Sequence, residues 1–440
     1  MKVTETDYAP FRGFRVVRFE INLNVRGNEM FQCLKRVTYR VSDIEKAKNW
    51  YRTILDTEPT FDSPFAVVFP IGDSGLVLTP NANSPSNSDD TVVAYWGIDD
   101  IDFAYKKLLQ FGAAPHTEIQ SVFGTRVATV LDPFGNILGI ITTNVDAKKR
   151  SVEQQPSETA LGAVFLRTLA SIDERGEIQG NDTIAEIFLT ESQRIRLKDP
   201  AVRKWVMKNP PGMYEYLIAR TAFFDDIVEQ ALRENIPQIV FLGAGYDSRP
   251  YRFKDLIKET SIFELDIHTT QQRKKELLHQ ANISLPEQLI FVSINFNKDT
   301  LSDVLFQAGY DKNQKALFIW EGVTYYLPAR VVDDTLNFIR SKSPSGSTIC
   351  FDYSSRWPEM LDSFGVRELM EFMKRNHPGE PTQFGIEKGE IVSFLSDRGY
   401  KIIDHLEALD MERLYLTLRG GSSVGKVPAL LCFVRAAVLD

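Results

Sequence analysis

The feature that most constrains the fold is an apolar run that ends in a glycine-rich turn. The run, Ile239–Leu242, is of strand length, and Gly243 and Gly245 follow it. A second apolar run ends in two acids, Glu264 and Asp266. Glycines let the backbone turn tightly and approach a ligand closely. An acid about 20 residues further on, at the end of the next strand, is placed to accept hydrogen bonds from ribose hydroxyls. The pattern predicts an open α/β sheet that binds an adenosine-containing cofactor.

The third glycine that this turn lacks indicates which cofactor the turn binds. Dinucleotide-binding loops follow G-x-G-x-x-G, in which the last glycine lets helix and strand pack closely. Here Ser248 takes that place, and Asp247 stands where a pyrophosphate would approach. An anionic side chain there disfavours a diphosphate and tolerates a cationic or zwitterionic ligand. S-adenosylmethionine, with its sulfonium and amino groups, fits this turn better than a dinucleotide.

Length and composition indicate a soluble protein with more than one domain. A chain of 440 residues is too long for one ordinary core, so we expect two domains or three. Hydrophobic residues make up 43% of the chain and charged residues 25%, as in globular proteins. The net charge of −8 disfavours a nucleic-acid partner.

The sequence also predicts a compartment. No apolar run reaches the length of a membrane-spanning helix, about 18 residues, and the first residues lack the apolar core of a signal peptide. Cys33, Cys350 and Cys432 lie far apart and show no zinc-binding spacing. We expect a cytoplasmic protein with reduced thiols, no metal and no membrane partner.

Residues 33–145 show one β-rich plan twice. The phrase RVSDIEKAKNWYRTIL, a strand end, an acid and a helix, recurs as GIDDIDFAYKKLLQFG. Such self-similarity predicts an internal βαβββ duplication. The expected elements are strands at Leu34–Val41, Ala66–Phe69 and Leu76–Leu78 with a helix at Ile44–Ile54, then strands at Thr91–Ile98, Thr125–Leu131 and Ile137–Thr142 with a helix at Ile101–Phe111.

This half resembles the vicinal oxygen chelate superfamily, which includes glyoxalases and bleomycin-resistance proteins. The resemblance rests on RVSDIEKAKNWYRTIL and on the later DPFGNILGI. It implies metal ligands at positions that fall on Arg36, near Val93 and on Gly139, and none of these residues can bind a metal. His116, the only histidine of this half, is expected in a surface loop. We expect an α+β domain without metal or chelate chemistry, whose remaining role is binding or interaction.

Residues 147–159 are polar and predict a linker between a first domain, 1–146, and a second, 160–440. Beyond the linker helices alternate with strands, which is typical of a doubly wound α/β domain. The expected helices are Ala160–Ser171, Asp182–Phe188, Pro200–Val206 and Met213–Glu234, and the expected strands are Gln238–Leu242, Ile262–Leu265, Leu289–Val292, Ala316–Trp320, Thr348–Phe351 and a final pair at Arg413–Leu418 and Leu430–Val438.

The second half resembles the leucine carboxyl methyltransferase family and related bacterial O-methyltransferases, which are often found near polyketide pathways of secondary metabolism. The resemblance rests on five motifs in the family's order, YLIARTAFFDD, VFLGAGYDSRPYRF, IFELDIHTTQQRKKE, INFNKDTL and WEGVTYYLP. It implies a class I methyltransferase fold, a Rossmann-like doubly wound sheet, with S-adenosyl-L-methionine as the cofactor.

The same resemblance implies how two charged residues bind the cofactor. Arg220 matches the family's arginine and would fork onto the cofactor carboxylate, a geometry that lysine does not match. An arginine paired with Asp225 or Asp226 at the edge of a packed helix is the alternative. Asp266 matches the ribose contact, and Glu264, on the same strand face, is the candidate for a structural acid.

Further cofactor contacts are implied along the cleft. Gly243 and Gly245 bring the backbone close to the cofactor, and Glu321 is placed to pair with its ammonium group, unless it is a solvated helix start. Asn295 and Phe296 are expected to contact the adenine. Relatives usually carry Asp-Leu at this pair, so these two residues depart from the family pattern.

The reaction class follows from the electrophile. A sulfonium methyl is already activated, so the enzyme must mainly align a nucleophile and exclude water. A carboxylate with a pKa near ~4 needs no base, whereas a phenol near ~10 would benefit from one. No compelling His–Asp pair is visible, which favours carboxyl methylation. Tyr325 and Tyr326 are the candidate catalytic residues, although they could simply cover the sheet.

Residues 356–398 combine aromatic and charged side chains and predict a lid over the cleft. Arg356 and Arg367 are candidate receptors for an acidic substrate, with plain surface arginines as the alternative.

Three functions stay open at this point. The first is methyl-ester formation on a carboxylate of a small molecule or peptide, with a non-catalytic glyoxalase-like domain attached. The second is methylation of a hydroxyl of a polyketide-like or phenolic metabolite. The third is a metabolite-binding or resistance protein that acts through the first domain. A homodimer is expected by resemblance alone.

Overall fold

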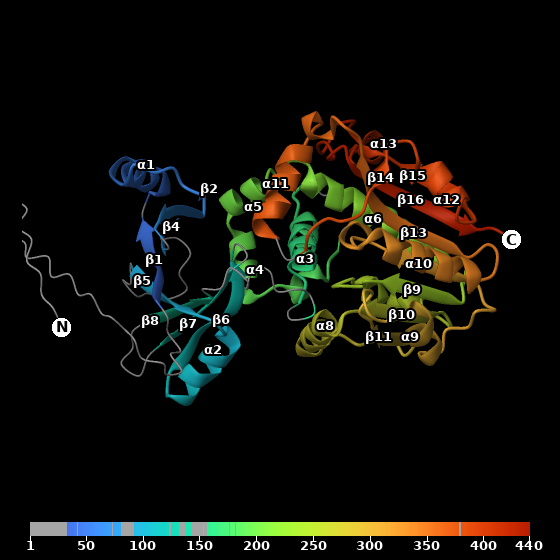
Figure 1. Cartoon of the computed structure of the whole chain (residues 1–440), viewed down its shortest axis with the longest axis horizontal. Coiled ribbons are helices and arrows are strands. Elements are labelled where there is room, and N and C mark those ends of the chain that lie inside the picture. Colours follow the sequence, from blue (N-terminus) through green and yellow to red (C-terminus); the bar gives the residue numbers. More distant parts are fainter. Residues whose placement is uncertain are drawn as a thin grey trace, which may run out of the picture.

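The computed structural model describes residues 33–440 apart from 42, 73, 81–91, 123–124, 132–136, 143–152, 154–155, 176, 181 and 378–379. The N-terminal segment, the DPFGN part of the later motif and most of the expected linker therefore lie outside the described residues. Two separate sheets, each with its own helices, make up the described chain (Figure 1). None of the helices in the described part is long and apolar enough to cross a membrane.

The first sheet confirms the predicted duplication. Its strand order is β2-β3-β4-β1-β5-β8-β7-β6, with the two copies joined by antiparallel pairing of β1 and β5. In each copy the first strand pairs in parallel with the last. The elements are β1 (Cys33–Val41), α1 (Ile44–Leu55), β2 (Phe61–Ser63), β3 (Ala66–Ile71), β4 (Ser74–Pro80), β5 (Val92–Ile98), α2 (Ile101–Gln110), β6 (Ala114–Val122), β7 (Thr125–Leu131) and β8 (Ile137–Thr142).

The repeated acid before each helix caps that helix. The Asp43 carboxylate accepts a hydrogen bond from the Lys46 backbone N–H at 3.0 Å, and the Asp100 carboxylate accepts one from Phe103 at 3.0 Å. An acceptor at this position satisfies one of the free N–H groups at a helix start. The strand–acid–helix phrase therefore encodes the same local structure in both copies.

The sequence prediction missed two strands of this sheet, β2 and β6. His116 lies within β6 and not in a loop, and its Nδ1 lies 2.7 Å from the Thr129 Oγ1 of β7. The strand is interrupted by register shifts against β7, so its side chains do not alternate regularly. That irregularity is why the period-two pattern of a strand was absent from the sequence.

The second sheet has the order β11-β10-β9-β12-β13-β16-β15, with β14 paired to β13. Strands β9 to β13 run parallel, and β16 runs antiparallel to both β13 and β15. The strand order reverses between β9 and β12, where open α/β sheets bind ligands. The strands are β9 (Gln238–Leu242), β10 (Ser261–Asp266), β11 (Leu289–Ser293), β12 (Ala316–Trp320), β13 (Thr348–Arg356), β14 (Ile386–Glu387), β15 (Tyr400–Leu406) and β16 (Leu431–Val438).

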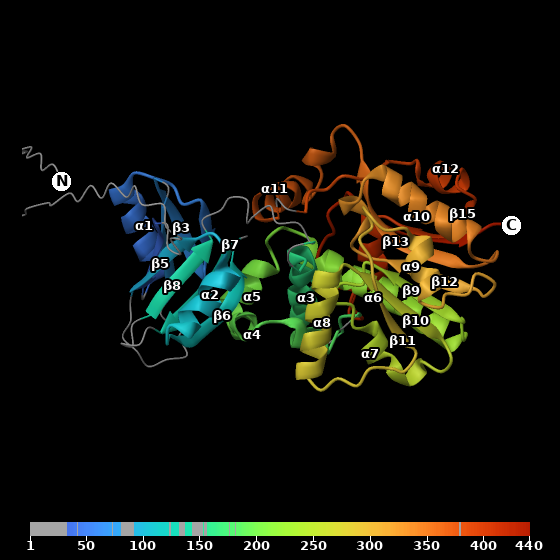
Figure 2. The same cartoon turned by 60° about the horizontal axis from the view of Figure 1, so that its bottom comes forward.

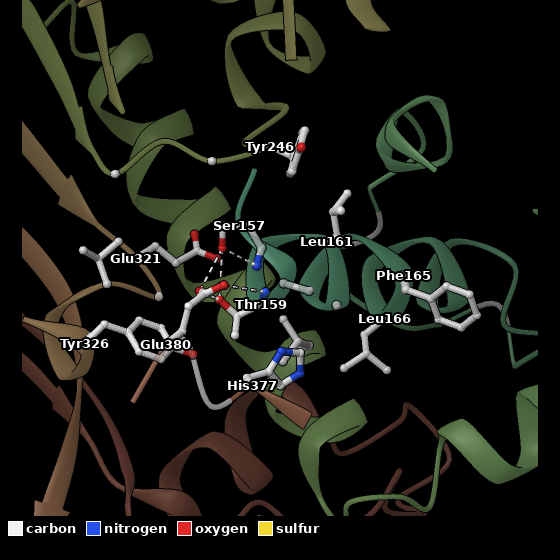
Figure 3. Close-up of a pocket in the computed structure, with 18 of the residues that line it drawn as sticks. Ser157, Thr159, Leu161, Phe165, Leu166, Tyr246, Glu321, Tyr326, His377 and Glu380 are labelled. Atoms are coloured by element: carbon white, nitrogen blue, oxygen red, sulfur yellow. Dashed lines mark hydrogen bonds between the residues drawn. The ribbon is translucent and has the colours of Figure 1, made fainter. Parts of the chain in front are cut away.

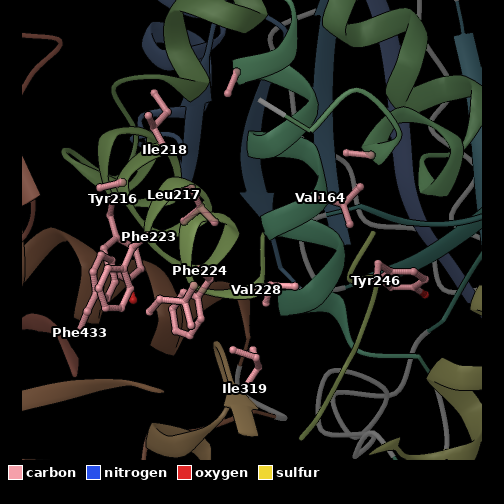
Figure 4. Close-up of a cluster of buried hydrophobic side chains, with 14 of the residues drawn as sticks. Val164, Tyr216, Leu217, Ile218, Phe223, Phe224, Val228, Tyr246, Ile319 and Phe433 are labelled. Carbon is pink, nitrogen blue, oxygen red and sulfur yellow. The ribbon is translucent and has the colours of Figure 1, made fainter. Parts of the chain in front are cut away.

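Helices cover both faces of this sheet, as Figure 2 shows. Strand β9 is buried along its length and sends Ile239 and Phe241 to one face and Val240 and Leu242 to the other. The first face packs against α6 and its aromatic residues (Figure 4), and the second packs against α10. The helices used below are α3 (Glu158–Ser171), α4 (Glu191–Lys198), α5 (Pro200–Val206), α6 (Met213–Arg233), α8 (His268–Gln280), α10 (Ala329–Ser341), α11 (Val366–Asn376) and α13 (Ala408–Tyr415).

The strand predicted at Arg413–Leu418 is wrong. Residues 408–415 form α13, and the antiparallel partner of β16 is β15 at Tyr400–Leu406. The helix begins with a capping box, in which the Glu407 backbone N–H donates to the Asp410 carboxylate at 3.2 Å. Residues 182–188 also contain only a short 3-10 turn, at Ala185–Phe188, and α4 was not predicted.

Candidate cofactor and acceptor site

A cavity of about 550 Å³ begins at the carboxyl ends of β9 and β12, the point where the strand order reverses. Its volume is that of an ordinary small-molecule site, which spans about 300–1,000 Å³. The lining includes Gly243 and Glu321 at this end and extends to Phe61 and Trp205 at the other. Both domains therefore contribute walls to one cavity.

The glycine turn after β9 requires glycine at its first position. Gly243 has φ +71°, and a Cβ there would lie 2.6 Å from a methyl carbon of Val323. Gly245 has φ +48°, and its backbone N–H donates to the Asp266 carboxylate. The turn thus brings bare backbone to the cavity wall and ties it to the next strand.

Asp266 faces the cavity, whereas Glu264 does not. The second oxygen of the Asp266 carboxylate accepts from the Ile267 N–H at 2.7 Å. Burial raises the pKa of Asp266 to about 6, against the lowering effect of its two backbone hydrogen bonds. The Glu264 carboxylate is buried against Lys274 at 2.7 Å and serves the core.

An arginine–carboxylate network lies beside the turn. Glu321 binds two guanidinium groups, with its Oε1 at 3.0 Å from Arg220 Nε and its Oε2 at 2.7 Å from Arg249 Nη1. Burial alone would lower the pKa of Arg220, but the charge of Glu321 above all raises it well above its ordinary value. Among the described residues, Arg220 pairs with neither Asp225 nor Asp226, so the alternative pairing is wrong.

The charge of Asp247 is neutralised within the same network. Its carboxylate lies 2.6 Å from Arg249 Nη1, while Asp225 takes the Arg249 Nε at 2.7 Å. Burial favours the neutral acid, but Arg249 holds the pKa of Asp247 below its ordinary value. The expectation that Asp247 repels a diphosphate by its own charge therefore needs correction, because a cation already offsets that charge.

The sequence prediction missed Asp352, which anchors the network from β13. This buried carboxylate accepts from the Tyr216 hydroxyl and from the Gly322 backbone N–H, both at 2.6 Å. Arg220 Nη1 lies 3.3 Å from the same carboxylate and 3.4 Å from the Tyr325 hydroxyl. The sequence did offer a signal for Asp352, because it is an acid within an otherwise apolar strand, and that strand neighbours β12, which precedes Glu321.

Asn295 and Phe296 line the cavity after β11, as predicted. The Asn295 amide is partly engaged, because its Nδ2 donates to Glu153 at 2.7 Å and its Oδ1 accepts from Asn297 at 3.0 Å. Phe296 packs against the core beneath the sheet. The pair is placed to contact a planar ring.

Glu380 contacts the residues at the start of α3 beside the cavity (Figure 3). Ser157 Oγ donates to the Glu380 carboxylate at 3.0 Å, and the Thr159 hydroxyl donates to the same carboxylate. His377 and Tyr326 line the same part of the cavity. Sequence reasoning missed Glu380, because an isolated acid in a Pro-Gly loop has no pattern that marks it.

The two predicted substrate arginines do not line the cavity. Arg356 Nη2 donates to the Gln383 carbonyl at 3.0 Å, and Arg367 pairs with Asp362 at 2.9 Å with 54% of its side chain exposed. Helix α11 instead contributes Leu369 and Phe372 to the cavity lining. The segment therefore lines the cavity with apolar side chains and with His377 and Glu380, and the two predicted arginines lie elsewhere.

Three neighbouring strands of the first sheet, β1, β5 and β8, place Arg36, Tyr95 and Gly139 side by side in one row across the sheet. Arg36 pairs with Tyr95 across β1 and β5, and Tyr95 pairs with Gly139 across β5 and β8. Val93, which was placed near this row from the sequence, pairs instead with Thr38. Across the described residues, no group of three or more His, Cys, Asp or Glu side chains is arranged to hold a metal ion.

Known proteins match both halves. The leucine carboxyl methyltransferase family matches residues 160–340, and the glyoxalase/bleomycin resistance protein/dioxygenase superfamily matches residues 34–140. A Bacillus subtilis protein named "Putative S-adenosyl-L-methionine-dependent methyltransferase YktD" is 30% identical over 230 residues, 52% of this chain and 74% of that protein. Proteins of the same description from Streptomyces coelicolor (31% identical, 46% of this chain, 71% of that one) and Mycobacterium marinum (25%, 61% and 88%) match as well.

The doubly wound sheet with its glycine turn is a class I methyltransferase fold, preceded by a glyoxalase-like α+β domain. The chain belongs to the S-adenosyl-L-methionine-dependent methyltransferases, and its residues 160–340 match the leucine carboxyl methyltransferase family. Its cofactor is S-adenosyl-L-methionine. The cavity residues suit that molecule, because Asp266 can accept from hydroxyls, Arg220 can receive a carboxylate and the turn at Gly243 leaves room for a close approach.

Proposed function

We propose that the chain is an O-methyltransferase that forms a methyl ester on a carboxylate of a small molecule or peptide. The observation that carries this proposal is the pair of tyrosines beside Arg220. Burial above all, and then the charge of Asp352, raises the pKa of Tyr325 well above its ordinary value. Burial and the charge of Glu380 raise that of Tyr326 as well.

These tyrosines stay protonated and act as hydrogen-bond donors rather than bases. A carboxylate acceptor is ionised at neutral pH, since its pKa is near ~4, and it needs donors and no base. S-adenosyl-L-methionine supplies, when bound, an activated methyl group. The residues of this chain then orient the acceptor, exclude water with α11 and hold the tyrosine protons in place.

For the cofactor we propose the residues that the family motifs indicate. Asp266 accepts from the ribose hydroxyls, and Asn295 with Phe296 contacts the adenine. Arg220 binds the carboxylate, and Glu321 pairs with the ammonium group. Gly243 and Gly245 supply backbone contacts. The positions of these seven residues around one cavity support the proposal.

Hydroxyl methylation is the second candidate, and His377 favours it. This imidazole lines the cavity at the end of α11 and is the described histidine that a bound acceptor could meet. A phenol with a pKa near ~10 would gain from such a base. Base treatment of the product separates the two functions, because esters saponify and ethers survive.

The test is incubation of the full chain with methyl-labelled cofactor and a panel of aromatic and aliphatic carboxylic acids, followed by mass spectrometry. We expect a product heavier by one CH₂ that alkali returns to the starting acid. An alkali-stable product from phenols, with none from carboxylic acids, would establish the second candidate instead.

For the first domain we propose a binding role without chelate chemistry. The support is the row of Arg36, Tyr95 and Gly139, which offers no imidazole or carboxylate to a metal. Removal of divalent metals with a chelator should leave the methyl-transfer rate unchanged. Loss of the rate on chelation, restored by added metal, would contradict this role.

A further inference from the structure

Arg36 and Tyr95 form a fixed pair on the first sheet. They lie directly opposite each other in the register of β1 and β5. The next strand makes room for the tyrosine ring, because a Cβ at Gly139 would lie only 2.6 Å from a ring carbon of Tyr95. The ring therefore rests over a glycine, with the arginine of the neighbouring strand beside it.

A second arginine reaches this pair from the other domain. Arg196 is in the last turn of α4, which lies between the first sheet and α3 in both views (Figures 1 and 2). The phenol of Tyr95 interacts electrostatically with Arg36, Arg40 and Arg196. Arg196 also lines the cavity. We call Arg36 and Arg196 the arginine pair.

The arginine pair lacks a described counter-charge. Within the part of the chain that the structure describes, no carboxylate acts on Arg36 or on Arg196, and their ionisable neighbour is the Tyr95 phenol, which burial keeps protonated by raising its pKa. Both side chains are half-buried, and burial lowers the pKa of each. Desolvated cations without a carboxylate are costly. A bound anion would offset that cost.

Aromatic side chains line the same cavity as Arg196. Trp205 of α5 lies 5.8 Å from Phe61 and 5.2 Å from Phe65, measured between ring centroids. All three rings line the cavity together with Arg196. We call these three residues the aromatic wall. Two of its rings come from the first domain and one from the second, so the domains build it jointly.

We propose that the acceptor spans this cavity and carries an anionic group apart from the group that is methylated. Arg196 holds the anionic group at the cavity wall, Arg36 adds to the positive charge there through its proximity to Tyr95, and the aromatic wall receives the apolar body of the molecule. Arg196 lines the cavity together with the aromatic wall, and the proposed cofactor contact Glu321 lines the same cavity, whereas Arg36 and Tyr95 are not among the lining residues. This inference rests on the proposed function and assigns the first domain a part in acceptor recognition.

The test uses the full chain saturated with S-adenosylhomocysteine and isothermal titration with 2-naphthoate, 2-naphthyl phosphate and the uncharged 2-naphthamide. We expect the two anions to bind more tightly than the amide. Arg196→Gln should weaken the anions by about tenfold, the value of one charge-assisted hydrogen bond, and Arg36→Gln should weaken them by less, without changing the amide in either variant. Lys198→Gln removes an exposed charge from the same helix and should change neither. The tighter anion identifies the favoured group as carboxylate or phosphate.

Equal affinity for anions and amide, or unchanged anion affinity in Arg196→Gln, would overturn the proposal. Equal losses for anion and amide would do so too, since they indicate a purely structural role. The affinity for S-adenosylhomocysteine, measured on each variant, shows whether the fold and the cofactor site persist. Loss of cofactor binding or of methyl transfer in the unmodified chain would refute the proposed function and leave the anion result standing separately.

Discussion

Arginines that are buried or half-buried have different neighbours at two sites of this molecule. In the methyltransferase domain, Arg220 and Arg249 are buried and face carboxylates, among them Glu321 and Asp352. At the boundary with the first domain, Arg36 faces a tyrosine, and no described carboxylate acts on it. The network neutralises Arg220 and Arg249 internally, whereas the arginine pair has no described carboxylate and is left, in our proposal, to a bound anion.

This difference in neighbouring charges indicates which ligand the arginine–carboxylate network and the arginine pair can each bind. An internally neutral network suits a zwitterionic cofactor, whose carboxylate and ammonium can each exchange with a partner already in place. Uncompensated cations suit an anion. Burial makes both arrangements selective, because charges interact more strongly away from water. The following changes test the contrast, from the largest expected effect to the smallest.

Replacing Arg249 should have the largest effect, because it would remove a buried cation that three carboxylates share, Asp225, Asp247 and Glu321. We expect Arg249→Met to lower the free energy of unfolding by about 3–5 kcal/mol, measured by chemical denaturation. Arg233→Met, which breaks an exposed pair with Glu229, is the matched control and should cost about 0.5 kcal/mol. Equal losses in both variants would show that the network is not needed for stability.

The cofactor role of the network is tested at Arg220. Arg220→Lys keeps the charge and removes the planar fork, so S-adenosylhomocysteine affinity should fall by about tenfold or more in isothermal titration. Asp266→Ala should have a similar effect, and Arg233→Lys should have none. Unchanged affinity in both site variants would refute the assigned cofactor contacts.

The proposed contact between Asp266 and the cofactor predicts that cofactor binding depends on pH. Because burial raises its pKa from 3.8 to about 6, the carboxylate gains a proton as the pH falls through that value and becomes a poorer acceptor. Affinity for S-adenosylhomocysteine should therefore fall as the pH is lowered from about 7 to about 5. Asp266→Asn should bind weakly and lose this dependence. A variant that keeps the full dependence would place the titrating group elsewhere.

His377 separates the two acceptor chemistries. If the acceptor is a carboxylate, His377→Gln should leave kcat nearly unchanged, because no base is needed. If it is a hydroxyl, the same variant should lose about a hundredfold in kcat. The measurement is kcat against pH for the variant and the unmodified chain, using the acceptor found in the mass-spectrometric screen.

The smallest effect is expected at Arg367, whose exposed pair with Asp362 lies off the cavity. Arg367→Gln should change the free energy of unfolding by less than about 0.5 kcal/mol and leave the acceptor KM unchanged. A raised KM would restore the lid arginine as an acceptor contact. That result would also show that Arg367, like the arginine pair, takes part in acceptor binding.

Much of the fold followed from local pattern. The strand Gln238–Leu242 and its glycine turn were predicted at their observed bounds, as were β7, β8 and β12. These strands are apolar, bounded by turn residues and regular. The strand predicted at Arg413–Leu418 failed, because residues 408–415 are set as a helix by a capping box and by packing against α6. The irregular β6 failed because its register shifts remove the alternation.

The site was predictable where a motif carries it. The seven predicted cofactor residues, Arg220 and Asp266 among them, line one cavity. Glu380 was missed because nothing in its neighbours marks it, and Asp352 was missed although an acid inside an apolar strand was a usable signal. Arg356 and Arg367 were proposed by charge alone, and charge does not say where a long side chain points.

The sequence by itself determined the two domains' fold classes, the glycine turn and the methyl-donor family, since these depend on residues close together in the chain. Only the tertiary structure decided which charges meet. Arg36, Tyr95 and Arg196 come from different strands and domains, and so do Ser157 and Glu380. The energy of such encounters depends on distance and burial between remote segments, which no local pattern records.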